Sequence, residues 1–201
     1  MNNLLTKEQI VAFEDDIAEC FNNAMIKAPV HLYSGNEDQI IDVFKNVKEE
    51  DWIFCTWRSH YQCLLKGVPQ EQIKKDILAG KSITLCYPEY KVYSSAIVTG
   101  NIPIATGTAL DIKRKGGTEH VWCFVGDMAS ETGAFFENWK YAVNHDLPIT
   151  FIIEDNGKSV CTDTKAVWNS ELYFANETRK IIYYQYETKY PHAGAGKRIQ
   201  F

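Results

Sequence analysis

The chain lacks the two glycine-rich loops that most often mark nucleotide-binding α/β proteins. Its 201 residues contain neither a GxxxxGK(S/T) loop nor a GxGxxG fingerprint. Both loops place backbone N–H groups around phosphates. Their absence counts against a Mg²⁺-nucleotide-binding α/β protein of either kind.

Paired cysteines, long apolar runs and excess positive charge are also missing. The six cysteines form no CxxC pair, and Cys55, Cys86 and Cys123 lie in apolar runs. This predicts buried, reduced thiols rather than zinc ligands or disulfides. Because no apolar run could span a membrane and no secretory leader is recognised, we expect a cytoplasmic protein without membrane contact. The net charge of −5 argues against nucleic-acid binding.

What is present is enough apolar content for one substantial core. Hydrophobic residues make up 45% of the chain, and no internal repeat or convincing linker interrupts it. We therefore expect a single domain over residues 1–201. An N-terminal helical segment at about residues 1–28 should pack on it, because Thr6 and Gln9 have the spacing of a capping box before apolar residues at helical spacing.

The most informative stretch of the chain predicts a strand, a helix and a second strand. Two β-rich runs at 120–125 and 148–154 flank a helical pattern at 131–145. Parallel strands joined by one crossover helix usually lie side by side, with a right-handed connection. Asp127 and Asn156 follow the two strands. They should therefore meet at the carboxyl edge of one sheet, where open α/β folds bind ligands.

Further patterns extend this unit into a larger sheet. Pro69 opens a helical pattern, residues 102–113 predict another helix, and residues 181–187 predict a further strand. The polar and aromatic mix at 80–95 indicates an irregular loop near the site. The predicted fold class is α/β, with a doubly wound, mainly parallel sheet and helices on both faces.

The two polar strand ends have two interpretations. Gly-Asp and Asp-Asn-Gly are common turn sequences, so an ordinary βαβ unit could carry them without a ligand. Alternatively, a carboxylate and an amide oxygen at one edge suit Mg²⁺, which is usually held by few protein groups plus phosphates. The spacing resembles the thiamine-diphosphate motif, with Met128 in place of its second Gly. That resemblance implies Asp127, Asn156 and the backbone carbonyl of Lys158 as metal ligands.

Four further segments occur in the order found in one enzyme family. They are His31-Leu32 with Gly35-Asn36-Glu37, Asp51 to Gly67 with its Trp-Arg-Ser-His core, Ser95 to Gly107, and Tyr190-Pro191-His192. From about residue 30 to 192 the chain resembles the alpha subunit of thiamine-diphosphate-dependent 2-oxo acid dehydrogenases, such as the pyruvate, branched-chain and acetoin enzymes. The resemblance is to a compact version, because the usual alpha subunit is longer. It implies the diphosphate-binding type of the thiamine-diphosphate fold.

The resemblance implies a site for thiamine diphosphate and Mg²⁺. Arg58 would bind the diphosphate, since a guanidinium suits bidentate phosphate binding, and the indole N–H of Trp57 could donate beside it. The backbones of Ala96 and Val98 would bind the aminopyrimidine, and Ile97 would wedge under the cofactor. The other cofactor-binding residues implied are Asp127, Met128, Ala129, Asn156 and Lys158. Without the resemblance, Arg58 could equally cap a helix, and the Ser-Ala-Ile-Val run could be a buried strand.

Three histidines are the candidate catalytic residues. The resemblance places His31 and His192 near the substrate and His60 close by. Imidazoles suit proton transfer because their ordinary pKa lies near operating pH. His120 and His145 lie outside every motif, and we expect them to be structural.

The resemblance also implies a partner. In this family the Glu that activates the aminopyrimidine comes from a beta subunit, and no matching acidic motif occurs here. We therefore expect half an active site, completed in an assembly of two alpha and two beta chains and acting on a small 2-oxo acid. The acyl acceptor could be lipoamide, an aldehyde or a proton. The alternatives are a carboligase outside any lipoyl complex and a non-catalytic scaffold of the same fold.

Overall fold

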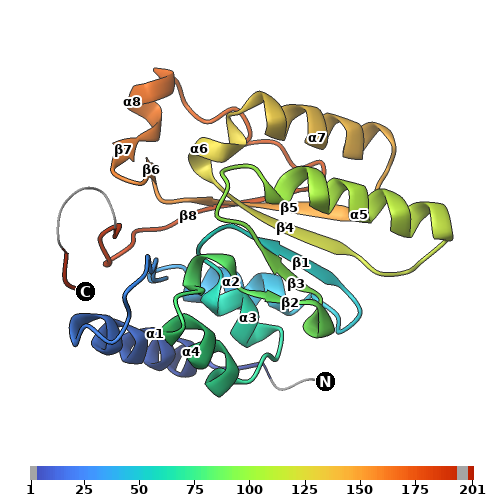
Figure 1. Cartoon of the computed structure of the whole chain (residues 1–201). Coiled ribbons are helices and arrows are strands. Elements are labelled where there is room, and N and C mark those ends of the chain that lie inside the picture. The colour runs from blue at the N-terminus through green and yellow to red at the C-terminus, as the bar shows by residue number, and fades with distance from the viewer. Residues whose placement is uncertain (1–3, 194–198) are drawn as a thin grey trace.

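A six-stranded, mostly parallel sheet forms the centre of the molecule (Figure 1). The computed structural model describes residues 4–193 and 199–201. The strands of the sheet are β1 (Trp52–Cys55), β2 (Cys86–Tyr87), β3 (Val92–Ser94), β4 (Val121–Gly126), β5 (Ile149–Asp155) and β8 (Ile181–Gln185). They lie in the order β2, β3, β1, β4, β5, β8. β2 is antiparallel to β3, and the other neighbouring pairs are parallel.

Helices cover both faces of the sheet (Figure 1). One layer comprises α1 (Lys7–Asn22), α2 (Glu37–Phe44), α3 (His60–Leu65) and α4 (Gln70–Leu78), and the other comprises α5 (Asn101–Lys115) and α7 (Gly133–Asn144). The shorter elements are η1 (Ser82–Thr84), η2 (Pro88–Tyr90), α6 (Asp127–Ser130), β6 (Lys158–Ser159), β7 (Thr162–Asp163) and α8 (Thr164–Trp168). This arrangement confirms the predicted α/β fold with a mainly parallel sheet and helices on both faces.

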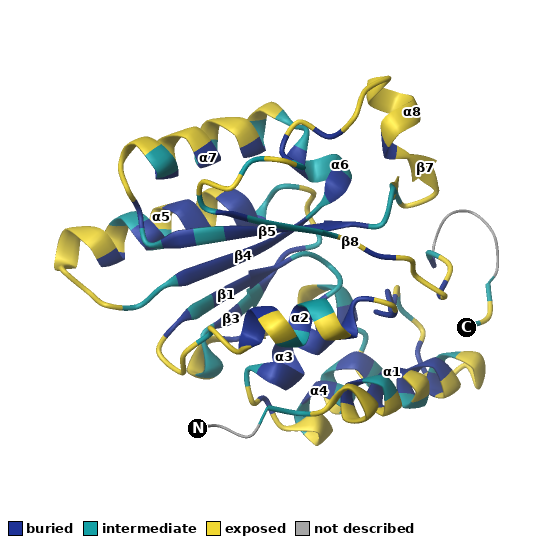
Figure 2. Ribbon diagram, turned by 180° about the vertical axis from the view of Figure 1, so that it is seen from behind, coloured by how far each residue is buried: buried dark blue, intermediate teal, exposed yellow. Residues whose placement is uncertain are grey.

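Strand β4 shows how the sequence builds a core on each side of the sheet. It is an unbroken apolar run, because a parallel strand covered on both faces buries every side chain. Trp122 and Phe124 belong to the apolar cluster under α1–α4, whereas Val121, Cys123 and Val125 belong to the cluster under α5 and α7. This alternation is the two-residue period of a strand. Figure 2 shows the buried strands between helices whose outer faces are exposed.

The predicted N-terminal helix is confirmed, including the cap at its start. The Thr6 side chain accepts from the Gln9 N–H and the Gln9 side chain accepts from the Thr6 N–H, so the capping box of α1 is present. The helix predicted at 131–145 begins only at residue 133, because Thr132 caps it after the short α6. In the described residues, no helix has both the length and the apolarity needed to cross a membrane.

Two local predictions were wrong. Residues 80–95 are not an irregular loop, since β3 pairs with β1 in the register Ile53–Val92 and Val92 is fully buried. Strands of two or three residues are too short to show an apolar period. Cys86 was predicted to be buried but is exposed, because the alternation along β2 turns Tyr87 inward and Cys86 outward. Cys55 and Cys123 are buried as predicted.

The segment after β8 packs closely against the segment that precedes α2. Gly35 has a φ of +87°, and a Cβ at this position would lie 1.9 Å from the carbonyl oxygen of Glu187. The Lys189 N–H also donates to Ser34 Oγ at 2.8 Å. These contacts tie the end of the chain that carries His192 to an early part of the sequence.

We expect Gly35→Ala to destabilise the fold more than Gly67→Ala. Both glycines have positive φ, +87° and +90°, where an L-residue costs about 1–2 kcal/mol. Only at Gly35 would the added Cβ collide with backbone, because Gly67 has nothing within 4 Å of that position. Urea unfolding of the two variants measures the difference. Equal losses of unfolding free energy would contradict the close approach to Glu187.

Candidate functional site

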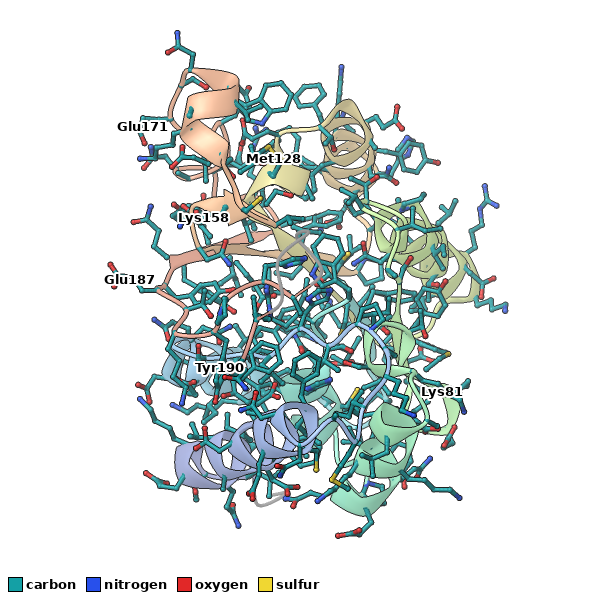
Figure 3. All side chains as sticks on the ribbon, turned by 60° about the vertical axis from the view of Figure 1, so that its left-hand side comes forward. Lys81, Met128, Lys158, Glu171, Glu187 and Tyr190 are labelled. Carbon is teal, nitrogen blue, oxygen red and sulfur yellow. The ribbon has the colours of Figure 1, made fainter. Side chains whose placement is uncertain are left out.

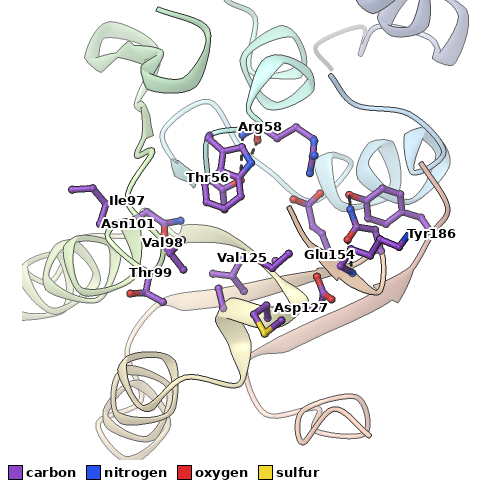
Figure 4. Close-up of a pocket in the computed structure, with 17 residues that line it drawn as sticks. Thr56, Arg58, Ile97, Val98, Thr99, Asn101, Val125, Asp127, Glu154 and Tyr186 are labelled. Carbon is purple, nitrogen blue, oxygen red and sulfur yellow. Dashed lines mark hydrogen bonds between the residues drawn. The ribbon is translucent and has the colours of Figure 1, made fainter. Parts of the chain in front are cut away.

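A pocket lies at the carboxyl edge of the sheet, where β1, β4 and β5 end (Figure 4). The predicted residues that line it are Trp57, Arg58, Ile97, Val98, Asp127, Met128, Ala129, Asn156 and Lys158. The lining residues that the sequence did not single out as site residues are Thr56, Thr99, Asn101, Val125, Gly126, Glu154, Ser159 and Tyr186. Ala96, His31, His60 and His192 do not line it. The site therefore gathers residues from five separate parts of the chain, at 56–58, 97–101, 125–129, 154–159 and Tyr186.

Asp127 follows β4 directly and is buried in the pocket wall, with 2% of its surface exposed. The Thr164 hydroxyl donates to Asp127 Oδ2 at 2.5 Å. Burial raises the pKa of Asp127 to about 6, the Thr164 hydrogen bond opposes that rise, and the charge of Asp155 adds to it. Because burial disfavours the charged form of this carboxyl group, a nearby cation would stabilise the carboxylate.

Asn156 follows β5 and lies at the same pocket. β4 and β5 pair in the register Gly126–Glu154, so the residues after both strands emerge together. The Asn156 side chain donates through Nδ2 to the Tyr186 hydroxyl at 3.4 Å and accepts the Lys158 N–H at Oδ1 at 3.1 Å. An amide oxygen has two lone pairs, so Oδ1 keeps one for a ligand.

The potential metal donors are few. Among residues 4–193 and 199–201, no group of three or more His, Cys, Asp or Glu side chains could hold a metal ion. The predicted set has a different composition: one carboxylate, one amide and one backbone carbonyl. Figure 3 shows Met128 and Lys158 close together at this edge of the molecule, and both line the pocket.

Arg58 lies across the pocket from Asp127 (Figure 4). Its Nε donates to the Leu32 carbonyl at 3.0 Å, and its guanidinium carbon lies 5.8 Å from the centre of the Tyr33 ring. These contacts hold the guanidinium plane in place. Trp57 Nε1 is buried and has no hydrogen-bond partner within the described structure. The guanidinium and the indole N–H together offer donors to an anion.

Two of the three predicted histidines come together beside Trp57. The His31 and His192 rings stack with centroids 4.1 Å apart, and each lies edge-on to the Trp57 ring at 6.1 and 6.4 Å. Burial, followed by the influence of His192 and Arg58, lowers the pKa of His31 to about 3. Burial also lowers the pKa of His192. His31 Nδ1 is buried without a partner in the described residues, so it is available to a ligand.

His60 is placed differently. It is fully buried, its Nδ1 lies 2.9 Å from Glu14 Oε2, and its Nε2 lies 2.9 Å from Ser82 Oγ. Glu14 also accepts the Tyr33 N–H through its other oxygen. Both ring nitrogens of His60 therefore have partners inside the α1–α4 layer, and His60 does not join the pair that His31 and His192 form beside Trp57.

Glu154 is the principal site residue that was not predicted. It is buried in the pocket wall and accepts hydrogen bonds from Tyr33, Tyr184 and Asn36 at 2.6 to 3.1 Å. Burial raises its pKa to about 7, and these donors together with Arg58 oppose the rise. Its position at the end of β5, two residues before Asn156, was the available signal. Its three partners are distant in sequence, so their convergence was not visible there.

The loop before α5 forms the rim of the pocket. Ile97, predicted to wedge under a cofactor, is 74% exposed, and Val98 is also exposed. Ala96 is half-buried beside them. Met128 and Ala129, in the first turn of α6, are half-buried in the opposite wall. The pocket thus has buried polar residues such as Asp127 and Glu154 in its wall and exposed apolar residues at its rim.

These features define an α/β protein with a sheet-edge pocket that offers oxygen donors to a cation and a guanidinium to an anion. The chain belongs to the dehydrogenase E1 component family, whose model matches residues 6–183. This confirms the predicted family resemblance.

The chain is also similar to individual proteins. The chain is 31% identical over 165 residues to the alpha subunit of acetoin:2,6-dichlorophenolindophenol oxidoreductase from Bacillus subtilis (strain 168), covering 77% of this chain and 49% of that one. It is 30% identical over 161 residues to the pyruvate dehydrogenase E1 component subunit alpha of Porphyra purpurea, covering 72% and 47%. A candidate thiamin diphosphate-dependent enzyme from Mycobacterium smegmatis overlaps with a TM-score of 0.42 at 16% identity, over 58% of this chain and 20% of that one. The chain spans about half the length of the curated relatives it matches.

Proposed function

We propose that this chain is the alpha subunit of an enzyme that uses thiamine diphosphate and Mg²⁺ to decarboxylate a 2-oxo acid and to transfer or release the resulting acyl or aldehyde unit. The observation that carries the proposal is the convergence of Asp127, Asn156 and Arg58 on one pocket. Relatives named as alpha subunits of an acetoin oxidoreductase and of pyruvate dehydrogenase support the same class of reaction.

The donors of the pocket fit a magnesium ion. Asp127 would supply a carboxylate oxygen, Asn156 its amide oxygen and Lys158 its backbone carbonyl. Mg²⁺ prefers oxygen ligands, keeps several waters, and is often bound through one or two carboxylates plus substrate phosphates. A cluster of acidic side chains is not needed for such a site, because the diphosphate would contribute oxygens of its own.

The opposite wall of the pocket fits the anion. Arg58 would bind the diphosphate, and the unpartnered Trp57 N–H could donate to it. Leaving a buried donor unsatisfied costs about 1–3 kcal/mol, so an acceptor at this point would remove that cost. The backbones of Ala96 and Val98 would bind the aminopyrimidine, and Ile97 would be covered by the bound cofactor.

When bound, thiamine diphosphate takes up the electron pair released as carbon dioxide leaves the 2-oxo acid. We propose that His31 and His192 hydrogen-bond the carbonyl oxygen of the substrate. His31 is neutral at neutral pH, because its pKa is about 3, so it acts as a neutral hydrogen-bonding group. His192 is half-buried, which suits proton exchange with solvent. His60 would hold the surrounding loop rather than contact substrate.

A beta-type subunit would complete the site by supplying the carboxylate that bonds the aminopyrimidine. The two buried carboxylates of the pocket, Asp127 and Glu154, are already engaged by hydroxyl donors. Ile97 and Val98 present an exposed apolar rim that a second chain could cover. An obligate contact of this kind is large and apolar, and we propose an assembly of two alpha and two beta chains.

The proposed assembly predicts that the purified chain alone releases no carbon dioxide from any 2-oxo acid. Co-expression with the partner that co-purifies with it should restore turnover of one member of a panel of 2-oxo acids. Light scattering should give the mass of a heterotetramer. Turnover by the isolated chain at the rate of the assembly would show that an internal carboxylate activates the cofactor, with Glu154 the first to test by Glu154→Gln. An assembly that binds no thiamine diphosphate would instead favour a scaffold subunit.

A further inference from the structure

Thr164 is the single buried residue in a stretch that otherwise faces solvent. Between Val160 and Glu171 every other residue is exposed, whereas Thr164 is 1% exposed. This stretch includes β7 and α8, which lie beside α6 (Figure 1). A hydroxyl that is buried in such a segment needs a hydrogen-bond partner inside the protein.

That partner is Asp127. The Thr164 hydroxyl donates to Asp127 Oδ2 at 2.5 Å, and the Thr164 N–H donates to the Gly157 carbonyl at 3.0 Å. On the other side, the Asp163 side chain accepts the Ala166 N–H at 2.7 Å and so caps α8. The backbone on both sides of Thr164 is therefore hydrogen-bonded, and this arrangement directs the hydroxyl at Asp127.

We propose that Thr164 is a positioning residue that orients the Asp127 carboxylate for a divalent cation; this inference rests on the proposed function. The hydroxyl holds Oδ2 and thereby fixes the side-chain rotation of Asp127. Oδ1 then remains as the oxygen for the cation. Removal of a group that hydrogen-bonds a metal ligand and so orients it typically lowers metal affinity 10- to 100-fold.

The Thr164 hydroxyl differs in its hydrogen-bond partner from a buried threonine hydroxyl that only stabilises a helix. Elsewhere in the chain, the buried hydroxyl of Thr106 bonds a backbone carbonyl of its own helix, Ile102 O, at 3.0 Å. The Thr164 hydroxyl instead bonds a side-chain oxygen that lines the pocket, 37 residues away in the sequence. Thr106 therefore provides the matched control for the loss of a buried hydroxyl.

The test uses the full chain co-purified with its partner subunit. Mg²⁺ is titrated at a fixed concentration of thiamine diphosphate and followed by intrinsic tryptophan fluorescence, with melting temperature without Mg²⁺ as the second measurement. Thr164→Val, which keeps the shape and removes the hydroxyl, should weaken Mg²⁺ binding 10- to 100-fold. Thr164→Ser should restore most of the affinity, and Thr106→Val should leave it unchanged.

The outcomes separate this inference from the proposed function. Wild-type Mg²⁺ affinity in Thr164→Val would overturn the positioning role while leaving the cofactor site intact. Equal weakening in Thr164→Val and Thr106→Val would also overturn it, because the effect would then follow from general loss of stability. A wild-type assembly that binds neither Mg²⁺ nor thiamine diphosphate would overturn the proposed function itself.

Discussion

Asp127→Ala should abolish the Mg²⁺-dependent binding of thiamine diphosphate. The variant removes the only carboxylate in the proposed ligand set, and the diphosphate would then face Asn156 and a backbone carbonyl without a strongly held cation. Hard cations such as Mg²⁺ depend on carboxylate charge when the protein contributes few ligands. Asn156→Ala should weaken binding rather than abolish it, because it removes a neutral donor.

Calorimetric titration of the co-purified assembly with thiamine diphosphate, in Mg²⁺ and in EDTA, measures this effect. Asp111→Ala is the matched control, since Asp111 is an exposed carboxylate on α5 that pairs with Lys115 and does not line the pocket. Asp127→Asn separates charge from shape. It keeps a hydrogen-bond acceptor for Thr164 but loses the charge, so it should resemble the alanine variant. If Asp127→Ala binds thiamine diphosphate in Mg²⁺ as tightly as the wild type, Asp127 is not a ligand of the metal.

His31→Ala and His192→Ala should each lower turnover while leaving the affinity for thiamine diphosphate nearly intact. The two rings stack beside Trp57 and do not line the pocket, and in the proposed function they contact the substrate rather than the diphosphate. A group that transfers protons, the role proposed for His192, typically contributes ~10²–10⁴-fold to rate, and a hydrogen-bonding group on a developing oxyanion, the role proposed for His31, contributes ~10²–10³-fold. We expect losses of that order in kcat.

Single-turnover and steady-state assays with the identified 2-oxo acid would measure these losses, with cofactor affinity determined on the same samples. His120→Ala is the matched control, because His120 bonds Thr150 at 2.9 Å near the amino end of β4, away from the pocket. Full turnover in both variants would reassign His31 and His192 as structural residues. A loss of cofactor affinity equal to the loss of turnover would place them in the diphosphate site instead.

The sequence by itself determined the strand–helix–strand unit and the edge at which its polar ends meet. The apolar run of β4, the helical period of α7 and the turn residues after each strand are local patterns. Two parallel strands joined by one crossover helix usually lie next to each other in the sheet. This is why Asp127 and Asn156 could be placed together before the fold was known, and why they line one pocket. The sequence did not predict the short strand β3, because three residues are too few to show a hydrophobic period.

The tertiary structure alone decided which polar groups meet around that edge. His60 matched a family motif, yet Glu14 from α1 and Ser82 from η1 occupy both of its ring nitrogens. Thr164 reaches Asp127 across 37 residues, and His192 reaches His31 because the end of the chain packs on an early segment. Such contacts depend on packing between elements distant in sequence. A buried polar group must find a partner when the core closes, but no local pattern encodes which partner lies within reach.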